Sequence, residues 1–304
     1  MLSFTVVLCT KDRADDVRKC LDSIALQTRL PNELLVVDSG TDDTRNLVLD
    51  FEKNNGNINV QYLRSEPGLT RQRNVGIRAA KTEVLHFFDD DCTLEPEYFA
   101  RLQEAFESDT ALLGAGPKLF LPYIPSPLGR LWRKTFLLAD VAGTGRIQPS
   151  GFGTYPWFSP NHENCEVDVL CGCCAFRRTV FESVMFDEYF AGYGYLEDLE
   201  FSYRVGKLGK LLYVPAARMT HWESPSARTN WRKLAKMQIV NHHYVFKKHL
   251  PQDLYHRSCF VWSEIGESIR RMSIFIKTGQ LDIVKGMIDG YWALMRNTNE
   301  SRHS

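Results

Sequence analysis

The sequence has no long apolar run and no excess of charge of either sign. No apolar stretch reaches the ~18 residues of a membrane-spanning helix, and the N-terminus lacks the basic segment and apolar stretch of a secretory signal. The 304 residues carry 37 basic and 37 acidic side chains, so the overall charge does not favour nucleic acid as a partner. We therefore expect a cytoplasmic protein that does not bind nucleic acid.

Glycine-rich phosphate loops and a disulfide framework are also absent. The turn after the first apolar run, Cys9–Arg13, contains no glycine, which argues against a dinucleotide-binding G-x-G-x-x-G turn. No G-x-x-x-x-G-K-[ST] occurs either, so an NTPase phosphate loop is not supported. Eight cysteines are scattered through the chain, which is not the pattern of a disulfide-rich secreted domain, and we expect reduced thiols.

Apolar runs alternate with amphipathic stretches through the first 90 residues. This alternation predicts a parallel sheet with right-handed crossovers. Later apolar runs extend the sheet, so we expect an α/β fold with a mixed, mainly parallel sheet flanked by helices. The expected strands are 4–9, 34–38, 60–63, 84–88, 112–120 and 211–215.

Three consecutive acids, Asp89, Asp90 and Asp91, follow the strand at 84–88. Burying a carboxylate without a counter-charge costs several kcal/mol or more, so these acids should lie at an opening of the fold. In open α/β sheets the ligand site lies at the carboxyl ends of the strands. Oxygen ligands there suit Mg²⁺ or Mn²⁺. A solvated acidic turn is the alternative. Thr10 and Asp38 end two other strands, and we expect all of these tips to converge on one rim.

Five segments in order resemble the family 2 glycosyltransferases of the GT-A fold. Four lie in the N-terminal half, and the fifth resembles the family's Glu-Asp acceptor-side motif. The segments are Val7–Arg13, Leu35–Thr44, Gly68–Ile77, Phe88–Asp91 and Gly192–Arg204. The resemblance covers roughly residues 3–225. It implies a catalytic domain over 1–225, with a nucleotide-binding half at about 1–118 and an acceptor half at about 119–225, and a C-terminal helical extension over 226–304.

The resemblance also implies the reaction. A member of this family would move a sugar from a nucleotide-diphosphate donor, with UDP or dTDP types favoured, to a hydroxyl of a glycan or lipid-linked acceptor, with inversion. A sugar nucleotidyltransferase is an alternative, but it needs a glycine-rich triphosphate loop that residues 9–14 lack. A catalytically silent glycan-binding module is another, and the joint presence of Asp89, Asp91, Asp198 and His221 argues against it.

The donor-binding residues follow from the same resemblance. Asp38 would accept a hydrogen bond from the N3–H of the nucleobase, beside Thr10, because a carboxylate complements an imide donor. An arginine fork would hold the diphosphate, and Arg73 matches the family position better than Arg71. A turn or cap acid is the alternative for Asp38, and a solvated helix face is the alternative for the arginines. The full donor set is Thr10, Arg13, Asp38, Arg71, Arg73, Asp89 and Asp90.

The metal and acceptor residues complete the implied site. Asp91 and His221 would hold Mg²⁺ or Mn²⁺, which stabilises the departing nucleoside diphosphate; a surface histidine is the alternative for His221. Asp198 would be the general base, and Glu197 would bind the acceptor or be the base if the register differs by one. An acidic first turn of a helix is the alternative for both.

Two further segments carry open alternatives. The Pro-, Gly- and aromatic-rich stretch 121–165 predicts an irregular excursion, either an acceptor loop or lid or a satellite hydrophobic cluster. Cys171-x-x-Cys174 is compatible with zinc, but no second C-x-x-C occurs at ribbon spacing, and buried thiols are favoured.

The segment after Asn230 predicts three helices, the last two at about 253–277 and 281–295. These helices either pack on the catalytic domain or lie on the inner face of a membrane. In the second case we expect Trp231, Tyr244 and Phe246, with Lys247–Lys248, to face anionic lipid.

Overall fold

The computed structural model describes residues 1–122, 126–158, 163–222, 224 and 230–300, with side chains up to residue 296. The chain forms two compact units. Unit 1 comprises Met1–Ile124, Val141–Arg146 and Tyr155–Ser224, and unit 2 comprises Pro125–Asp140, Ile147–Thr154 and Pro225–Ser304. Within the described residues, no helix has both the length and the apolar character needed to cross a bilayer.

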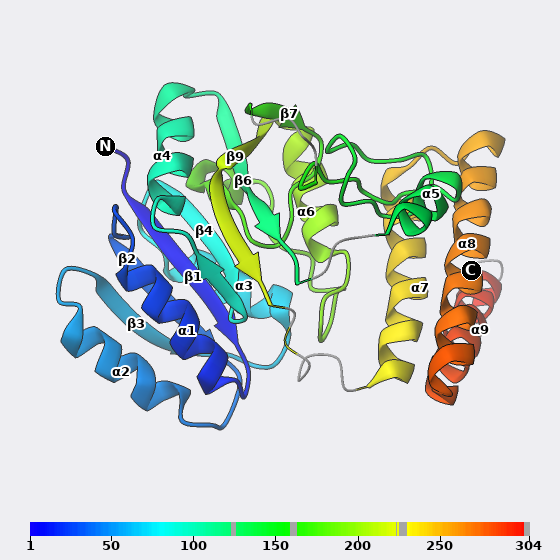
Figure 1. Cartoon of the computed structure of the whole chain (residues 1–304), viewed down its shortest axis with the longest axis horizontal. Helices are drawn as coiled ribbons and strands as arrows, with labels where there is room; N and C mark the ends of the chain where they lie inside the picture. The colour runs from blue at the N-terminus through cyan, green and yellow to red at the C-terminus, as the bar shows by residue number, and fades with distance from the viewer. Residues whose placement is uncertain (123–125, 159–162, 223, 225–229, 301–304) are drawn as a thin grey trace. The chain divides into compact units, whose positions relative to one another are not determined.

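The described part of unit 1 contains a nine-stranded mixed sheet in the order β3-β2-β1-β4-β8-β6-β9-β5, with β7 paired to β9 (Figure 1). Strands β1 to β4 pair in parallel, as the sequence predicts, whereas pairs of both directions occur beyond β4. The strands are β1 Phe4–Thr10, β2 Glu33–Asp38, β3 Asn59–Arg64, β4 Val84–Asp89, β5 Cys92–Leu94, β6 Leu112–Phe120, β7 Cys165–Val167, β8 Ala175–Arg177 and β9 Lys210–His221.

Helices cover both faces of this sheet. Alternate residues of a strand point to opposite faces, so Val6 and Leu8 of β1 lie in one core cluster and Val7 lies in the other. The first cluster includes residues of α1, α2 and α4, and the second includes residues of α3 and α6. The helices of unit 1 are α1 Ala14–Ala25, α2 Thr44–Asn54, α3 Leu69–Ala79, α4 Tyr98–Ser108 and α6 Glu197–Gly206, with a 3₁₀ turn at Arg178–Glu182.

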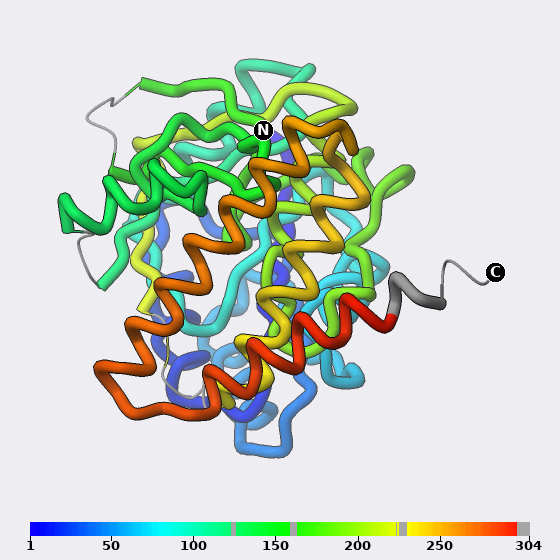
Figure 2. The backbone as a smooth tube through the Cα atoms, turned by 90° about the vertical axis from the view of Figure 1, so that its right-hand side faces the viewer, coloured from blue at the N-terminus to red at the C-terminus, as the bar shows by residue number. Residues whose placement is uncertain are grey.

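Unit 2 is helical in its described regular elements. It contains α5 Pro127–Thr135, α7 Trp231–His249, α8 Leu254–Thr278 and α9 Leu281–Glu300. The three C-terminal helices lie side by side (Figure 2). Two glycines of α9 permit its close approach to α7, because an added Cβ at Gly286 would meet Ala235 and one at Gly290 would meet Ile239.

The segment 121–165 differs from the irregular excursion that its composition predicts. Residues 123–125 and 159–162 lie outside the described residues, but Pro127–Thr135 forms a regular helix, α5. Ser126 caps this helix by accepting a hydrogen bond from the Gly129 N–H, and Pro127 occupies its first position, where a missing N–H costs nothing. Pro125–Asp140 and Ile147–Thr154 group with the C-terminal helices in unit 2. The stacking of Phe136 on Trp262 of α8, with ring centroids 4.6 Å apart, helps to hold the first of these segments there.

Candidate active site

The three consecutive acids at the end of β4 contact three different cationic side chains. Asp89 pairs with Arg73 of α3 at 3.1 Å. Asp90 pairs with Arg13 at 2.6 Å. Asp91 pairs with His221 of β9 at 3.0 Å. Each acid therefore ties the β4 tip to a different element, and the three carboxylates have separate surroundings.

Asp90 is the most enclosed of the three. Its carboxylate accepts hydrogen bonds from the Thr10 hydroxyl at 2.8 Å and from Arg13. Burial raises the pKa of Asp90 to about 7, although the charge of Arg13 acts in the opposite direction. Thr10 and Arg13, which the family resemblance assigns to the donor, are thus held by Asp90 in this structure.

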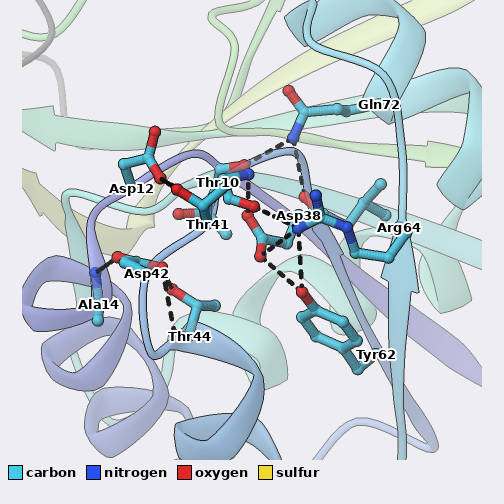
Figure 3. A network of polar contacts seen from close by, with 12 residues as sticks. Thr10, Asp12, Ala14, Asp38, Thr41, Asp42, Thr44, Tyr62, Arg64 and Gln72 are labelled. Carbon is cyan, nitrogen blue, oxygen red and sulfur yellow. Dashed lines mark hydrogen bonds and ion pairs between the residues drawn. The ribbon is translucent and has the colours of Figure 1, made fainter.

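Asp38, at the end of β2, is fully buried in a polar network (Figure 3). One carboxylate oxygen accepts the Gly40 N–H at 2.6 Å, as in a turn acid. The other accepts hydrogen bonds from the Tyr62 hydroxyl at 2.7 Å and from Arg64 at 3.1 Å. Sequence reasoning missed Tyr62 and Arg64. Tyr62 and Arg64 are two residues apart on β3 and so point to the same face of the strand. Because β3 pairs in parallel with β2, with Arg64 beside Asp38, this spacing was the signal that could have identified them.

Gln72 of α3 also binds to the strand tips. Its side-chain amide donates to the carbonyls of Thr10 at 2.8 Å and Val37 at 2.9 Å (Figure 3). These carbonyls belong to neighbouring strands, β1 and β2. A single buried amide therefore fixes the spacing of the first two strand ends.

The loops after β1 and β2 are joined by two exchanged aspartates (Figure 3). Asp12 accepts the Thr41 N–H at 2.6 Å. Asp42 accepts the Ala14 N–H at 2.8 Å, which satisfies a free donor at the start of α1. Each loop thus supplies the carboxylate that orders the other.

Gly40 lies where these loops approach most closely. A Cβ there would be 2.7 Å from the Asp12 carboxylate and 3.1 Å from that of Asp38, with the Asp12 backbone closer still. We expect Gly40→Ala to lower the free energy of unfolding by about 1–3 kcal/mol, because the backbone must shift. Gly56→Ala is the control, since nothing lies within 4 Å of an added Cβ there. Urea unfolding that gave equal midpoints for the two variants would contradict this packing.

Arg73 connects the β4 tip with the first turn of α6. Its side chain is 1% exposed, and it pairs with Glu197 at 2.5 Å as well as with Asp89. Gly172 lies against this cluster, because a Cβ there would be 3.1 Å from the Arg73 guanidinium and 3.8 Å from both carboxylates. The sequence analysis did not assign Gly172 to the site. The signal that could have indicated it is that Gly172 interrupts the cysteines of the run Cys171–Cys174.

Arg71 and Asn74 have different surroundings from Arg73. The Arg71 side chain is 50% exposed and pairs with Glu188 at 3.4 Å. Asn74 exchanges hydrogen bonds with the backbone of Phe186, donating at 2.9 Å and accepting at 3.0 Å. Asn74 therefore anchors the chain before α6. Of the two arginines, only Arg73 lies in the acid cluster.

Glu197 and Asp198 open α6 in distinct environments. Glu197 is buried, and its Oε2 atom has no hydrogen-bond partner among the described residues. Burial raises the pKa of Glu197 to about 8, although Arg73 opposes the shift. Asp198 is half-buried and accepts the Leu199 N–H at 2.8 Å. Burial also raises the pKa of Asp198.

Asp91 and His221 form the candidate metal centre. The Asp91 carboxylate also accepts the Ser224 N–H at 2.7 Å. Burial favours the neutral acid, but the hydrogen bond from His221 lowers the pKa of Asp91 to about 2, and Asp91 in turn raises the pKa of His221 to about 9. A bound cation would therefore displace the imidazole proton. Carboxylate and imidazole are both ligands that Mn²⁺ accepts, and Mg²⁺ accepts the carboxylate.

Cys92 lies beside this pair and is a residue that the sequence analysis did not assign. Among the described residues, Asp91, Cys92 and His221 are the group whose potential ligand atoms lie within 4.8 Å of one another. Burial raises the pKa of the Cys92 thiol, and its sulfur lies 3.5 Å from that of Cys173. All eight cysteines are free thiols, so the favoured interpretation of the Cys171–Cys174 run, buried thiols, agrees with the structure.

Comparison with known proteins places this site in a family. The family model of glycosyl transferase family 2 matches residues 5–184. The glycosyltransferase EpsJ of Bacillus subtilis is 31% identical over 102 residues, which are 33% of this chain and 29% of EpsJ. The chondroitin synthase of Pasteurella multocida is 24% identical over 281 residues, which are 82% of this chain and 28% of the synthase. The chain thus spans about a third of the length of the curated relatives that it matches.

A solved structure of similar fold is the mannosyltransferase PcManGT of Pyrobaculum calidifontis in complex with GDP-Man and Mn²⁺. It superposes with a TM-score of 0.60 at 15% identity and covers 96% of this chain and 88% of that one. This likeness confirms the expected GT-A fold. Because the family model covers more than half of the sequence, the chain belongs to glycosyl transferase family 2.

Proposed function

We propose that this chain is an inverting, metal-dependent glycosyltransferase that moves a sugar from a nucleotide-diphosphate donor to a hydroxyl of a glycan or lipid-linked acceptor. The observation that carries the proposal is the pairing of Arg73 with both Asp89 and Glu197. The Arg73 side chain contacts both the end of β4, on the proposed donor side, and the start of α6, on the proposed acceptor side. A base on one side and a leaving group on the other are what a single displacement requires.

On the donor side, Asp91 and His221 would hold Mg²⁺ or Mn²⁺. The bound ion supplies electrostatic stabilisation of the departing diphosphate. The structurally similar mannosyltransferase contains GDP-Man and Mn²⁺, which supports a nucleotide sugar and a divalent cation here as well. Arg73 and Arg13 would orient donor oxygens once the ligand competes with Asp89 and Asp90. Asp38 would accept a hydrogen bond from the imide N–H of a uracil or thymine base. A UDP or dTDP donor is therefore favoured.

On the acceptor side, Asp198 would take the proton of the attacking hydroxyl. Its raised pKa makes it a stronger base than an exposed aspartate. Glu197 is bound to Arg73 through one oxygen, and its unpartnered Oε2 is suited to receive the acceptor hydroxyl. This division of roles favours Asp198 over Glu197 as the base. A lipid-linked acceptor would bring the chain to the inner face of a membrane.

Asp91→Ala tests the donor side. We expect it to weaken Mn²⁺-dependent binding of the nucleotide sugar by at least ~10–100-fold, because the loss of an outer-shell partner already costs that much and here a ligand of the metal itself is lost. The measurement is the rise in melting temperature with UDP, dTDP and GDP sugars, with and without Mn²⁺, since a ligand that binds the folded state stabilises it.

Glu95→Ala is the matched control for this experiment. Glu95 directly follows β5, and its exposed carboxylate lies 3.9 Å from Arg218. It should leave the Mn²⁺-dependent shift unchanged. Equal shifts in wild type and Asp91→Ala would remove Asp91 from the metal site, and no shift with any sugar nucleotide would argue against the proposed reaction.

A further inference from the structure

Helix α8 of unit 2 buries several polar side chains and leaves a row of apolar side chains exposed. A helix of a soluble protein normally turns its apolar stripe to the core. In α8 the residues that are buried are polar or glycine: Ser263, Glu264, Gly266, Glu267 and Arg271. The fully buried positions of α8 are thus polar or glycine, while apolar residues such as Phe260 and Met272 are only partly buried.

The outer face of α8 is a continuous apolar stripe. Leu254, Val261, Ile265, Ile269 and Ile276 follow one another at intervals of seven, four, four and seven residues, which places them on one side of a helix. Their exposed fractions are 82%, 55%, 44%, 47% and 77%. Single exposed apolar residues are ordinary, but a stripe along a whole helix marks an interaction surface.

Buried polar contacts fix this orientation. Glu264 accepts hydrogen bonds from His242 of α7 at 2.7 Å and from Tyr291 of α9 at 2.8 Å. Glu267 pairs with Arg270 at 2.7 Å and lies 3.5 Å from Arg271. Rotating α8 to bury the isoleucines would break both contacts of Glu264, whereas the pairs of Glu267 lie within α8 and would turn with it. The apolar stripe is therefore held outward by the packing of unit 2.

Unit 2 is also strongly basic. Its residues include 16 Lys and Arg against seven Asp and Glu, a net charge of +9, so unit 1 carries −9 in a chain that is neutral overall. Exposed Arg257 and Lys277 lie near the two ends of α8. Helix α5, whose C-terminal neighbour Phe136 stacks on Trp262, adds exposed Arg130 and Lys134.

We propose that unit 2 docks on an anionic lipid bilayer, with the outer stripe of α8 lying in the plane of the membrane interface. An apolar stripe bordered by lysine and arginine is the pattern of an interfacial helix, and anionic headgroups complement the +9 charge. A second copy docking through the same stripe would instead bring two units of like charge together. The stripe belongs to unit 2, whereas the proposed donor and acceptor residues belong to unit 1, and the proposal does not rest on the proposed reaction.

The stripe on α8 is not the lipid-facing surface that the sequence offers as an alternative to packing on the catalytic domain. Phe246 of α7, expected to face lipid, is 3% exposed and packs against Phe260 of α8, with ring centroids 4.5 Å apart. The periodicity of α7 could not show which of its faces is covered. Trp231, Lys247 and Lys248 are exposed, so of the residues expected to face lipid only Phe246 is fully buried.

Vesicle flotation with the full chain tests the proposal. The probes are phosphatidylcholine vesicles with and without about 30% phosphatidylglycerol. We expect binding to the anionic vesicles only, weakening as salt is raised. Ile265→Ser combined with Ile269→Ser should reduce the bound fraction at least ~10-fold, because apolar contact with the interface is lost. Arg257→Gln combined with Lys277→Gln should weaken binding to the anionic vesicles, and the remaining binding should depend less on salt concentration.

Leu26→Ser combined with Leu208→Ser is the matched control, because both leucines are exposed aliphatic residues of unit 1, and it should bind as wild type does. Circular dichroism checks that each variant is folded. The proposal is overturned if wild type does not float, or if the α8 variant floats as well as the control. Light scattering that showed a dimer converted to monomer by the α8 substitutions, with flotation unchanged, would assign the stripe to a second copy. Donor binding on the same samples reports separately on the proposed reaction.

Discussion

Asp198→Asn is expected to reduce sugar transfer by ~10³-fold while leaving donor binding within about twofold of wild type. The asparagine keeps the size of the side chain and can still accept the Leu199 N–H, so the start of α6 should not change. What is lost is the ability to take a proton. Burial raises the pKa of Asp198, which makes its carboxylate a stronger base than an exposed aspartate. An amide accepts no proton at neutral pH and cannot replace it.

The measurement is transfer rate with a saturating nucleotide sugar, alongside Mn²⁺-dependent thermal shift by the same donor. Asp16→Asn is the control, since Asp16 is an acid in the first turn of α1 and its substitution removes the same charge at a helix start. It should keep full transfer. If Asp198→Asn retained transfer and Glu197→Gln lost it, the base would be Glu197, the alternative that the sequence left open.

The convergence of the strand tips could be predicted from the sequence because it depends on local pattern. The β-α alternation fixes parallel pairing, and parallel strands present their carboxyl ends at one edge. The observed register agrees, with Thr10 paired to Asp38 and Cys9 paired to Asp89. Because these residues stand at the ends of strands, the sequence alone was enough to assign them to one rim.

The partners within that rim could not be predicted in the same way. Three adjacent acids have the same local sequence signal, and which of them meets Arg13, Arg73 or His221 depends on how separate elements pack. Buried charge must find a counter-charge, but that rule does not say which one. The sequence predicts that Glu197 binds the acceptor or is the base, and its pairing with Arg73 becomes visible only when α3 and α6 are placed together.

The helices show the same limit in another form. The periodicity of residues 253–277 predicts a helix, and α8 spans Leu254–Thr278. It does not predict that Glu264 faces inward, because this orientation comes from the partners of Glu264 on α7 and α9. The composition of residues 121–165 did not predict α5, for a simpler reason. Prolines around a segment lower helix propensity on average, yet Pro127 occupies the one position where proline favours a helix start.

Arg73→Met should lower the free energy of unfolding by about 3–5 kcal/mol, because it leaves the buried Glu197 and the partly exposed Asp89 without their shared cation. Arg73 is 1% exposed and Glu197 5% exposed, so water can compensate little of the lost pairing. Methionine keeps much of the arginine stem's volume, so the expected effect is mainly electrostatic. The measurement is urea unfolding followed by circular dichroism, compared at equal protein concentration.

Arg71→Met provides the internal comparison, since Arg71 lies on the same helix in an exposed pair with Glu188. Such a pair contributes about 0–1 kcal/mol, and the variant should unfold close to wild type. Adding Glu197→Gln to Arg73→Met should restore part of the loss, because it removes the carboxylate left unpaired. If Arg73→Met were no more destabilising than Arg71→Met, the Arg73 cluster would not be buried in solution, and the link between β4 and α6 that carries the proposed function would be lost.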